Sequence, residues 1–374
     1  MILPPATLGM LGGGQLGRYF VMSAHRLGYQ VIVLDPDPAS IAGAAADAQI
    51  VAAYDDAEAL RDLASRCDAV TCEFENVPAA SLALLEQHLP VRPAASAVRV
   101  CQDRREEKAF LTRAGVPVAP NLTLLPGEPL PALPSDLFPA ILKTAREGYD
   151  GKGQWTIHNA GELPAALAAS GVPCVLEKRL PLEGEFALTL ARSPSGAISA
   201  LPLVQNWHSG GILDQTRSPA NVPALEAEAQ RIAEHIIAAL DYVGVLTVEF
   251  FLVGGTLLVN EMAPRPHNSG HPSIDNAGCS QFELQVRALC DLPLPAQADV
   301  QPAILLNLLG DLWQDGTPDW AGALALPGVH LHLYGKGDAR PGRKMGHVTV
   351  TGRNWPTVEA TASQLRTLLG LPPR

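Results

Sequence analysis

A glycine-rich turn at residues 12–17 constrains the fold of this chain more than any other segment. The apolar run 7–11 leads into the turn, and an amphipathic stretch follows it. Further apolar runs at 31–34 and 69–74 continue the alternation of strand and helix signals. Such alternation predicts a parallel sheet flanked by helices. We expect this α/β unit to occupy residues 1–101.

The glycines of the turn also form a nucleotide-binding pattern. Gly12, Gly14 and Gly17 give G-x-G-x-x-G between a strand and a helix, and Asp35 ends the next strand. This is the Rossmann fingerprint of a dinucleotide site, so an NAD-dependent dehydrogenase is one candidate function. No obvious hydride-transfer site follows, and a better furnished nucleotide site lies downstream. We therefore interpret the turn as a substrate-binding or anion-binding loop.

Composition limits the partners of the chain. Its 374 residues suit two or three domains, and a net charge of -11 argues against a nucleic-acid partner. We find neither a membrane-spanning apolar run nor a secretory signal, so we expect a cytoplasmic protein. The six cysteines lack C-x-x-C spacing, which disfavours a zinc site or a disulfide framework.

The remaining segments predict a second unit that mixes helices and strands. A charged helix is expected at 102–114, and the proline-rich stretch 126–139 should be a loop. A longer helix is expected at 223–240. Strand signals lie at 140–143, 154–158, 174–178 and 186–191. Two alternating runs near the C-terminus, 329–334 and 347–351, predict a β-hairpin with a basic loop.

A lysine-bearing glycine loop is the first candidate for the nucleotide site. Only six of the 27 basic residues are lysines, which favours a specific need for a compact charge where lysine does occur. Lys143 ends a predicted strand, and a loop with three glycines and Lys152 follows at 148–154. Backbone donors and lysine could meet a triphosphate there, although the loop is not a Walker A motif. An ordinary hairpin turn is the alternative.

Two acidic residues in apolar strands are the second candidate. Glu249 and Glu261 flank Gly254-Gly255, and unpaired acids are costly in such strands, so we expect a magnesium ion between them. A two-residue turn would pair Glu249 with Asn260 and send Glu261 to the other face. We therefore predict a loop of odd length, such as three residues with a glycine bulge.

Two further segments carry polar groups suited to a nucleotide. Glu177 and Lys178 end a strand and could contact adenine, with Glu185 accepting from ribose hydroxyls. The segment 262–271, directly after Glu261, contains an arginine and two histidines without secondary-structure periodicity. It is typical of an active-site loop, in which Arg265 could stabilise phosphoryl charge.

Taken together, these motifs resemble the ATP-grasp superfamily. The motifs are Lys143, GYDGKGQ, EKRL with Glu185, and VEFF…LLVNE followed by APRPHNSGH. Together with GGGQLGR, EFENVP and RPGRKMGH, they are similar to the 5-(carboxyamino)imidazole ribonucleotide synthetase family of purine biosynthesis. The resemblance spans residue 9 to about 350.

The resemblance implies an ATP-grasp fold with α/β and α+β parts. The N-terminal substrate domain (1–101) would precede an ATP-grasp domain (102–300) with a mobile lid at about 118–190, and a small β-rich domain (301–374) would end the chain. The implied protein is a homodimeric ligase that uses ATP and Mg²⁺. Bicarbonate would attack the γ-phosphate to give carboxyphosphate, and the amine of 5-aminoimidazole ribonucleotide would capture either its carboxyl group or the carbon dioxide released from it.

The resemblance also assigns roles to residues. ATP would be held by Arg104, Lys143, Gly148, Tyr149, Asp150, Gly151, Lys152, Gly153, Gln154, Glu177, Lys178, Arg179, Leu180, Glu185, His208, Asn260 and Glu261. Glu249 and Glu261 would bind magnesium. The catalytic residues would be Asp150, Arg265, His267 and Lys344. The ribonucleotide would contact Gly14, Gln15, Glu73, Asn268, Ser269, Lys336, Arg343 and Lys344.

Other ATP-grasp ligases share this ATP machinery and differ in the acceptor. A formate-using glycinamide ribonucleotide ligase and a biotin carboxylase are therefore alternatives. A nucleotide-binding regulator without turnover is an alternative from a different class.

Overall fold

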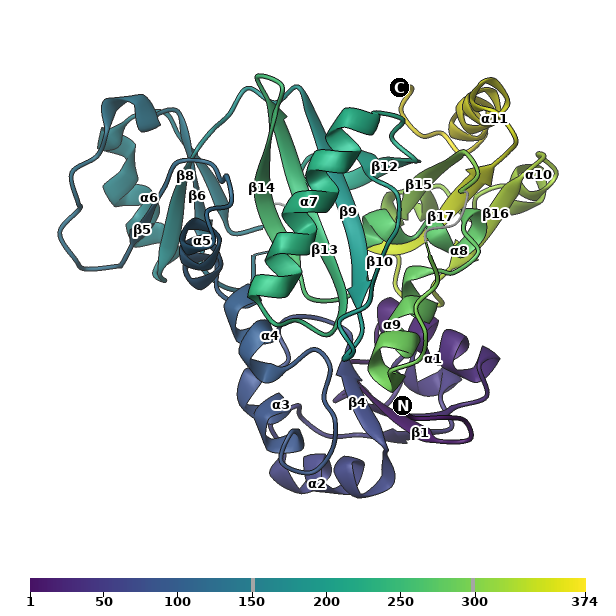
Figure 1. Ribbon diagram of the computed structural model, residues 1–374. Coiled ribbons are helices and arrows are strands. Elements are labelled where there is room, and N and C mark those ends of the chain that lie inside the picture. The colour runs from purple at the N-terminus through teal and green to yellow at the C-terminus, as the bar shows by residue number, and fades with distance from the viewer. Residues whose placement is uncertain (149–151, 297–299) are drawn as a thin grey trace.

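The structure, a computed structural model, describes residues 1–148, 152–296 and 300–374 (Figure 1). Its strands are β1 (Thr7–Leu11), β2 (Gln30–Leu34), β3 (Ala48–Ile50), β4 (Ala69–Cys72), β5 (Asn121–Leu124), β6 (Ala140–Thr144), β7 (Gln154–Ile157), β8 (Cys174–Lys178), β9 (Gly184–Arg192), β10 (Ile198–Ala200), β11 (Val204–Ser209), β12 (Ile212–Ser218), β13 (Gly244–Val253), β14 (Thr256–Ala263), β15 (Ala303–Leu309), β16 (Val329–Leu333) and β17 (Lys344–Thr351). Its α-helices are α1 (Gln15–Arg26), α2 (Ala57–Arg66), α3 (Ala79–Leu85), α4 (Ala95–Cys101), α5 (Arg104–Arg113), α6 (Leu163–Ser170), α7 (Pro223–Ala239), α8 (Ser273–Asn276), α9 (Gln281–Cys290), α10 (Trp320–Leu324) and α11 (Trp355–Leu368).

The N-terminal unit is the expected parallel sheet, with strand order β3-β2-β1-β4. Side chains of β2 alternate between two cores, because successive residues of a strand point to opposite faces. Val31 and Val33 pack with α1, whereas Ile32 and Leu34 pack with α2. Helices therefore cover both faces of the sheet, as the apolar strands indicate.

A nine-stranded antiparallel sheet forms the centre of the molecule, in the order β14-β13-β9-β11-β12-β15-β17-β16, with β10 on β9. Helix α7 begins with Pro223 and packs Ile232 and Ile236 against this sheet (Figure 1). The predicted C-terminal hairpin is confirmed as β16 and β17. Because β15 pairs with β12, the C-terminal strands continue the central sheet instead of forming a separate one.

The third sheet is antiparallel, in the order β5-β8-β6-β7, and lies to one side of the central sheet (Figure 1). It has its own core, in which Leu142 and Leu176 pack against Leu163 and Leu167 of α6. The predicted strand at 174–178 is confirmed as β8. A cavity opens between this small sheet and the central sheet, and it contains most of the predicted nucleotide site.

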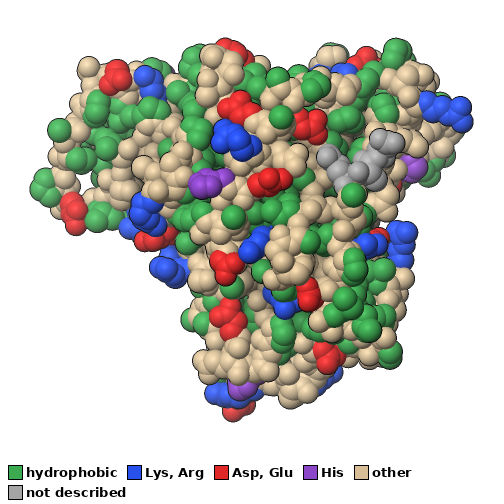
Figure 2. Space-filling model, in the orientation of Figure 1, with side chains coloured by type: hydrophobic (Ala, Val, Ile, Leu, Met, Phe, Trp, Pro, Cys, Tyr) green, Lys and Arg blue, Asp and Glu red, His purple; other side chains and the backbone are tan. Residues whose placement is uncertain are grey.

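The surface carries charges of both signs. On the face drawn in Figure 2, the Lys and Arg side chains are interspersed with Asp and Glu side chains. Among the described residues, no helix is both long and apolar enough to span a bilayer.

Candidate active site

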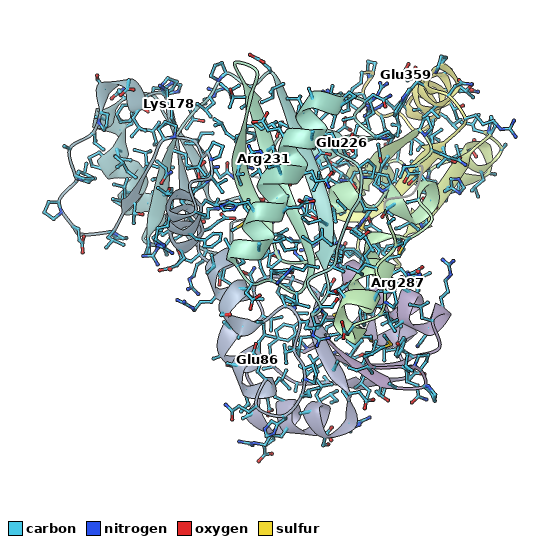
Figure 3. All side chains as sticks on the ribbon, in the orientation of Figure 1. Glu86, Lys178, Glu226, Arg231, Arg287 and Glu359 are labelled. Atoms are coloured by element: carbon cyan, nitrogen blue, oxygen red, sulfur yellow. The ribbon has the colours of Figure 1, made fainter. Side chains whose placement is uncertain are left out.

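The first cavity, of about 790 Å³, lies between the third sheet and the central sheet. This volume is typical of a site for a small ligand. Lys178, labelled in Figure 3, lies on β8 at its wall. Many of the residues predicted to bind ATP or metal line this cavity: Arg104, Lys143, Gln154, Glu177, Lys178, Arg179, Leu180, Glu185, His208, Glu249, Asn260 and Glu261.

The second cavity, of about 530 Å³, lies at the carboxyl ends of β1 and β4. Ligands of parallel sheets bind at this edge. Gly14, Gln15 and Glu73, which were predicted to contact the ribonucleotide, line the cavity together with Arg265. Gly148, predicted to bind ATP, lines this cavity as well.

The two cavities meet. Five residues line both of them: Arg104, Glu261, His267, Asn268 and Lys344. A ligand in the first cavity and a ligand in the second would therefore face the same side chains. Such a junction suits the transfer of a group between two bound molecules.

A buried pair of lysines faces one carboxylate in the first cavity. Lys143 donates to Glu177 over 2.7 Å, and the Nζ atom of Lys108 lies 3.4 Å from the other oxygen of Glu177. Burial lowers the pKa of Lys143, although Glu177 opposes this shift. Sequence reasoning gave Lys108 no role, although it stands four residues after Arg104 on the same helix.

Glu185 and His208 form a second polar pair in the first cavity. The Nδ1 atom of His208 lies 3.0 Å from a carboxylate oxygen of Glu185. Burial works against protonation of the imidazole, but Glu185 outweighs it and raises the pKa of His208. The pairing of β11 with β12 shifts by one residue next to this pair, because Trp207 pairs with Gln215 whereas His208 pairs with Leu213.

In the hairpin of β13 and β14, Glu249 and Glu261 share one face as predicted, but not for the predicted reason. Our prediction of an odd-length loop was wrong, because Val253 pairs with Thr256 and the turn has the two residues Gly254 and Gly255. Instead, β14 contains a bulge: Phe250 pairs with Val259 and Glu249 pairs with Glu261. The bulge leaves Asn260 as the extra residue and puts both carboxylates on one face.

The facing carboxylates fit a hard divalent cation. Burial raises the pKa of Glu249 above its ordinary value, and the nearby Glu261 raises it further. Burial also works against ionisation of Glu261, but the Arg104 guanidinium, 2.7 Å away, outweighs it and lowers the pKa of Glu261. Two carboxylates and the Asn260 amide are oxygen donors of the kind that magnesium and calcium prefer.

His267 and Asn268 stand at the junction of the cavities. The Nε2 atom of His267 lies 3.3 Å from Glu249, and its Nδ1 atom lies 2.8 Å from the hydroxyl of Ser269. Burial lowers the pKa of His267 to about 3, and Arg265 adds to this shift, so the imidazole is uncharged at neutral pH. The buried amide of Asn268 has no hydrogen-bond partner within the described parts of the chain.

Arg265 is held by an acid that sequence reasoning did not assign. Its guanidinium contacts both carboxylate oxygens of Glu75, at 2.5 and 3.2 Å. Burial opposes ionisation of Glu75, but Arg265 outweighs it and lowers the pKa of Glu75. The only sequence signal for this pair was the acidic segment directly after β4.

The glycine turn lacks the free backbone donors of a dinucleotide site. The carboxylate of Glu73 accepts from the backbone N–H groups of Gly14 and Leu16, at 2.5 and 3.0 Å. Asp35 accepts from Gly13 at 2.6 Å. Backbone donors that would hold a pyrophosphate in a Rossmann domain therefore already have carboxylate partners. This arrangement argues against the dehydrogenase alternative.

Several predicted residues lie elsewhere. In the part of the chain that the structure describes, neither cavity is lined by Lys152, Gly153, Ser269, Lys336 or Arg343. Ser269 is fully buried beneath His267, so it can orient that imidazole but is not exposed to a ligand. Lys336 donates to the carbonyl of Lys344, and Arg343 donates to that of Asp338. The predicted Tyr149, Asp150 and Gly151 lie outside the described residues.

Known families match almost the whole chain. A ribonucleotide synthetase preATP-grasp domain model matches residues 5–102, and an ATP-grasp domain model matches residues 109–282. A phosphoribosylaminoimidazole carboxylase C-terminal domain model matches residues 303–361.

Similar proteins cover nearly the full length. The N5-carboxyaminoimidazole ribonucleotide synthase of Pseudomonas aeruginosa is 40% identical over 97% of this chain and 99% of its own. That of Bacillus subtilis is 40% identical over 93% of this chain and 92% of its own. A crystal structure of the Aspergillus clavatus synthase with ADP and 5-aminoimidazole ribonucleotide has a TM-score of 0.87 at 33% identity, and covers 98% of this chain and 99% of its own.

Proposed function

The chain belongs to the family of N5-carboxyaminoimidazole ribonucleotide synthases, and we propose that it carboxylates the amine of 5-aminoimidazole ribonucleotide with bicarbonate and ATP. It is an ATP-grasp ligase of purine biosynthesis. The meeting of the two cavities at five shared residues is the observation that carries this proposal.

ATP would occupy the first cavity. Its adenine end would lie near Glu177 to Leu180 and Glu185, and its phosphates near Lys143 and Arg104. Glu249 and Glu261, with Asn260 beside them, would hold magnesium. When bound, magnesium neutralises phosphate charge and so favours attack at phosphorus.

The ribonucleotide would occupy the second cavity, against Gly14, Gln15 and Glu73. Among the three basic residues assigned to its phosphate, Lys344 borders the cavity and supports that role most directly. Asn268 offers amide groups to both ligands because it borders both cavities. The complex of the Aspergillus clavatus relative with ADP and 5-aminoimidazole ribonucleotide supports the pairing of these two ligands.

The chemistry would take place at the junction. A bicarbonate oxygen attacks the γ-phosphorus, the bond to ADP breaks, and carboxyphosphate forms. The amine nitrogen then bonds to the carboxyl carbon, inorganic phosphate leaves, and the amine loses a proton. Arg265, fixed by Glu75, would stabilise the charge of carboxyphosphate, and the uncharged His267 would offer it a neutral hydrogen bond. Asp150, outside the described residues, remains our candidate for orienting the amine.

The test is ADP release in the presence of magnesium and bicarbonate, with and without 5-aminoimidazole ribonucleotide. The proposal expects strong stimulation by the ribonucleotide and none by glycinamide ribonucleotide with formate, or by biotin. Absence of stimulation by 5-aminoimidazole ribonucleotide would refute the assignment. We also propose a homodimer, as the family resemblance implies, which sedimentation analysis at micromolar concentration would test.

A further inference from the structure

The bulge at Asn260 keeps Leu257, Val259 and Met262 of β14 on the core face of the hairpin, but it is not of the glycine type. The run Leu257 to Met262 contains no glycine, and Asn260 does not have a positive φ angle. The two-residue turn on its own would continue a regular ladder and pair Glu249 with Asn260. The regular register would turn Glu261 toward the core and Met262 away from it, so the apolar pattern favours the shifted register, and contacts from outside the hairpin add to this preference.

Helix α5 supplies such contacts along the edge of the sheet. Strand β14 is the first strand of the central sheet, and within the described parts of the chain one side of its backbone is paired only by a single bridge between Val259 and Val118. Lys108 donates to the carbonyl of Asn260 over 2.6 Å. Glu107 accepts from the N–H of Met262 over 2.6 Å. The helix thus binds the backbone on both sides of Glu261.

A third residue of the helix acts on Glu261 itself. Arg104 lies three and four residues before Glu107 and Lys108, so the three side chains leave the helix on one face. Its guanidinium donates to Glu261 over 2.7 Å. Three successive residues of β14, at 260, 261 and 262, therefore each have an ionisable side chain of α5 as a partner.

The cost of burying these groups argues for a specific role. Glu107 and Lys108 are each only 2% exposed, and a charge in such surroundings is unfavourable unless it is paired and hydrogen-bonded. Apolar residues at the same helix positions would pack without that cost, as the fully buried Leu111 does one turn later. Apolar side chains could not bind the carbonyl of Asn260 or the N–H of Met262.

We infer that Glu107 and Lys108 are positioning residues that fix the bulge at Asn260 and thereby bring the carboxylates of Glu249 and Glu261 to one face for magnesium. This inference rests on the metal role in the proposed function. Lys108 also pairs with Glu177, which holds Lys143, so the same side chain links the metal-binding strand to the phosphate-binding lysine.

The first experiment measures ADP binding by calorimetry over a series of magnesium concentrations and in EDTA. Lys108→Met should raise the magnesium concentration for half-maximal enhancement of ADP binding about tenfold, because the Asn260 carbonyl loses its donor. Arg113→Met, which removes a charge from the exposed side of the same helix, should leave it within about twofold of wild type. A shift for Lys108→Met as small as that of Arg113→Met would overturn the inference.

A second comparison separates the bulge from the link to Lys143. Deleting Asn260 removes the extra residue and would pair Glu249 with Glu261 in a regular ladder that needs no anchor. In that background, Lys108→Met should change the magnesium requirement less than about twofold. A full tenfold effect in both backgrounds would show that Lys108 acts through Glu177. It would contradict the inference that Lys108 fixes the bulge.

Glu107 provides an independent pair of variants if Lys108→Met does not fold. Glu107→Gln keeps an oxygen that can accept from Met262, whereas Glu107→Met leaves that buried N–H unpaired. We expect a clearly larger magnesium shift for Glu107→Met, and equal shifts would contradict the inference. These readouts need neither the ribonucleotide nor turnover. A failure of ribonucleotide-stimulated ADP release would therefore remove the proposed acceptor and leave the role of α5 to be decided by the magnesium measurements.

Discussion

Glu249 lies directly opposite Glu261 across the β13–β14 hairpin, because Asn260, the residue before Glu261, is bulged and has no pairing partner on β13. The two carboxylates come from different strands but share one face at the wall of the first cavity. Either carboxylate alone would be a poor cation site in this position, so removal of one charge should have a large effect.

Glu261→Gln should nearly abolish turnover while the fold is retained, because glutamine keeps the shape but removes a charged oxygen ligand. We expect kcat to fall about 100-fold or more, equivalent to about 2.7 kcal/mol of transition-state stabilisation. Glu183→Gln is the matched control, since Glu183 is an exposed acid whose oxygens accept from the hairpin turn. Steady-state kinetics and thermal melting of both variants check the prediction. An active Glu261→Gln enzyme would remove this residue from the site.

Gly14→Ala should weaken ribonucleotide binding selectively. A Cβ atom at Gly14 would lie 2.3 Å from a carboxylate oxygen of Glu73, so Glu73 must move out of the glycine turn. We expect the KM for 5-aminoimidazole ribonucleotide to rise about tenfold, in line with the cost of overpacking. The affinity for ADP, measured by calorimetry, should change less than twofold. Equal losses for both ligands would contradict the separate roles of the two cavities.

Arg265→Lys should lower kcat about 100-fold, as the loss of a fixed charged donor does in other enzymes. Lysine cannot reproduce the two-pronged contact of Arg265 with Glu75, so the charge would no longer be held in one orientation. Rapid-quench measurement of ADP formation checks this expectation. Near wild-type chemistry in the Lys variant would show that a point charge is sufficient.

Asp103→Asn should reduce stability at neutral pH but not in acid. Burial works against ionisation of Asp103, yet hydrogen bonds from Arg105 and Arg146 lower its pKa to about 2. The unfolded value is about 3.9, so the charged form stabilises the fold above that pH, and this contribution is lost as the pH falls toward 2. Asparagine can still cap α5, so the variant isolates the charge.

We expect Asp103→Asn to lower the Tm by about 2–4 °C at pH 7. The difference from wild type should shrink as the pH falls below about 4. Melting curves at about pH 7, 5 and 2.5 measure this, because most of the contribution is lost only between about pH 3.9 and 2. A difference that stays constant over that range would exclude the charge as its cause.

Local patterns predicted much of the fold. Strands β1 and β8 were predicted with the bounds that they have, because apolar runs ending at Gly, Pro or charged residues define strands without reference to distant segments. The glycine turn after β1 and the proline that begins α7 are likewise local signals.

The bulge at Asn260 could not be predicted in the same way. Its anchor Lys108 precedes Asn260 by 152 residues, and Glu107 precedes Met262 by 155 residues. The pair of Glu75 and Arg265 is separated by 190 residues. Sequence spacing alone does not show that such distant residues are in contact. The sequence therefore predicted that Glu249 and Glu261 share a face, but it did not predict the bulge that brings this about.

The most direct test of the proposed reaction is the fate of the bicarbonate oxygens. The wild-type enzyme would be supplied with ATP, magnesium, 5-aminoimidazole ribonucleotide and ¹⁸O-labelled bicarbonate, and the inorganic phosphate would be analysed by mass spectrometry. If bicarbonate attacks the γ-phosphorus at the junction of the two cavities, each phosphate gains one labelled oxygen. Phosphate without label, formed at the same rate as ADP, would show that water attacks instead and would contradict the proposed reaction.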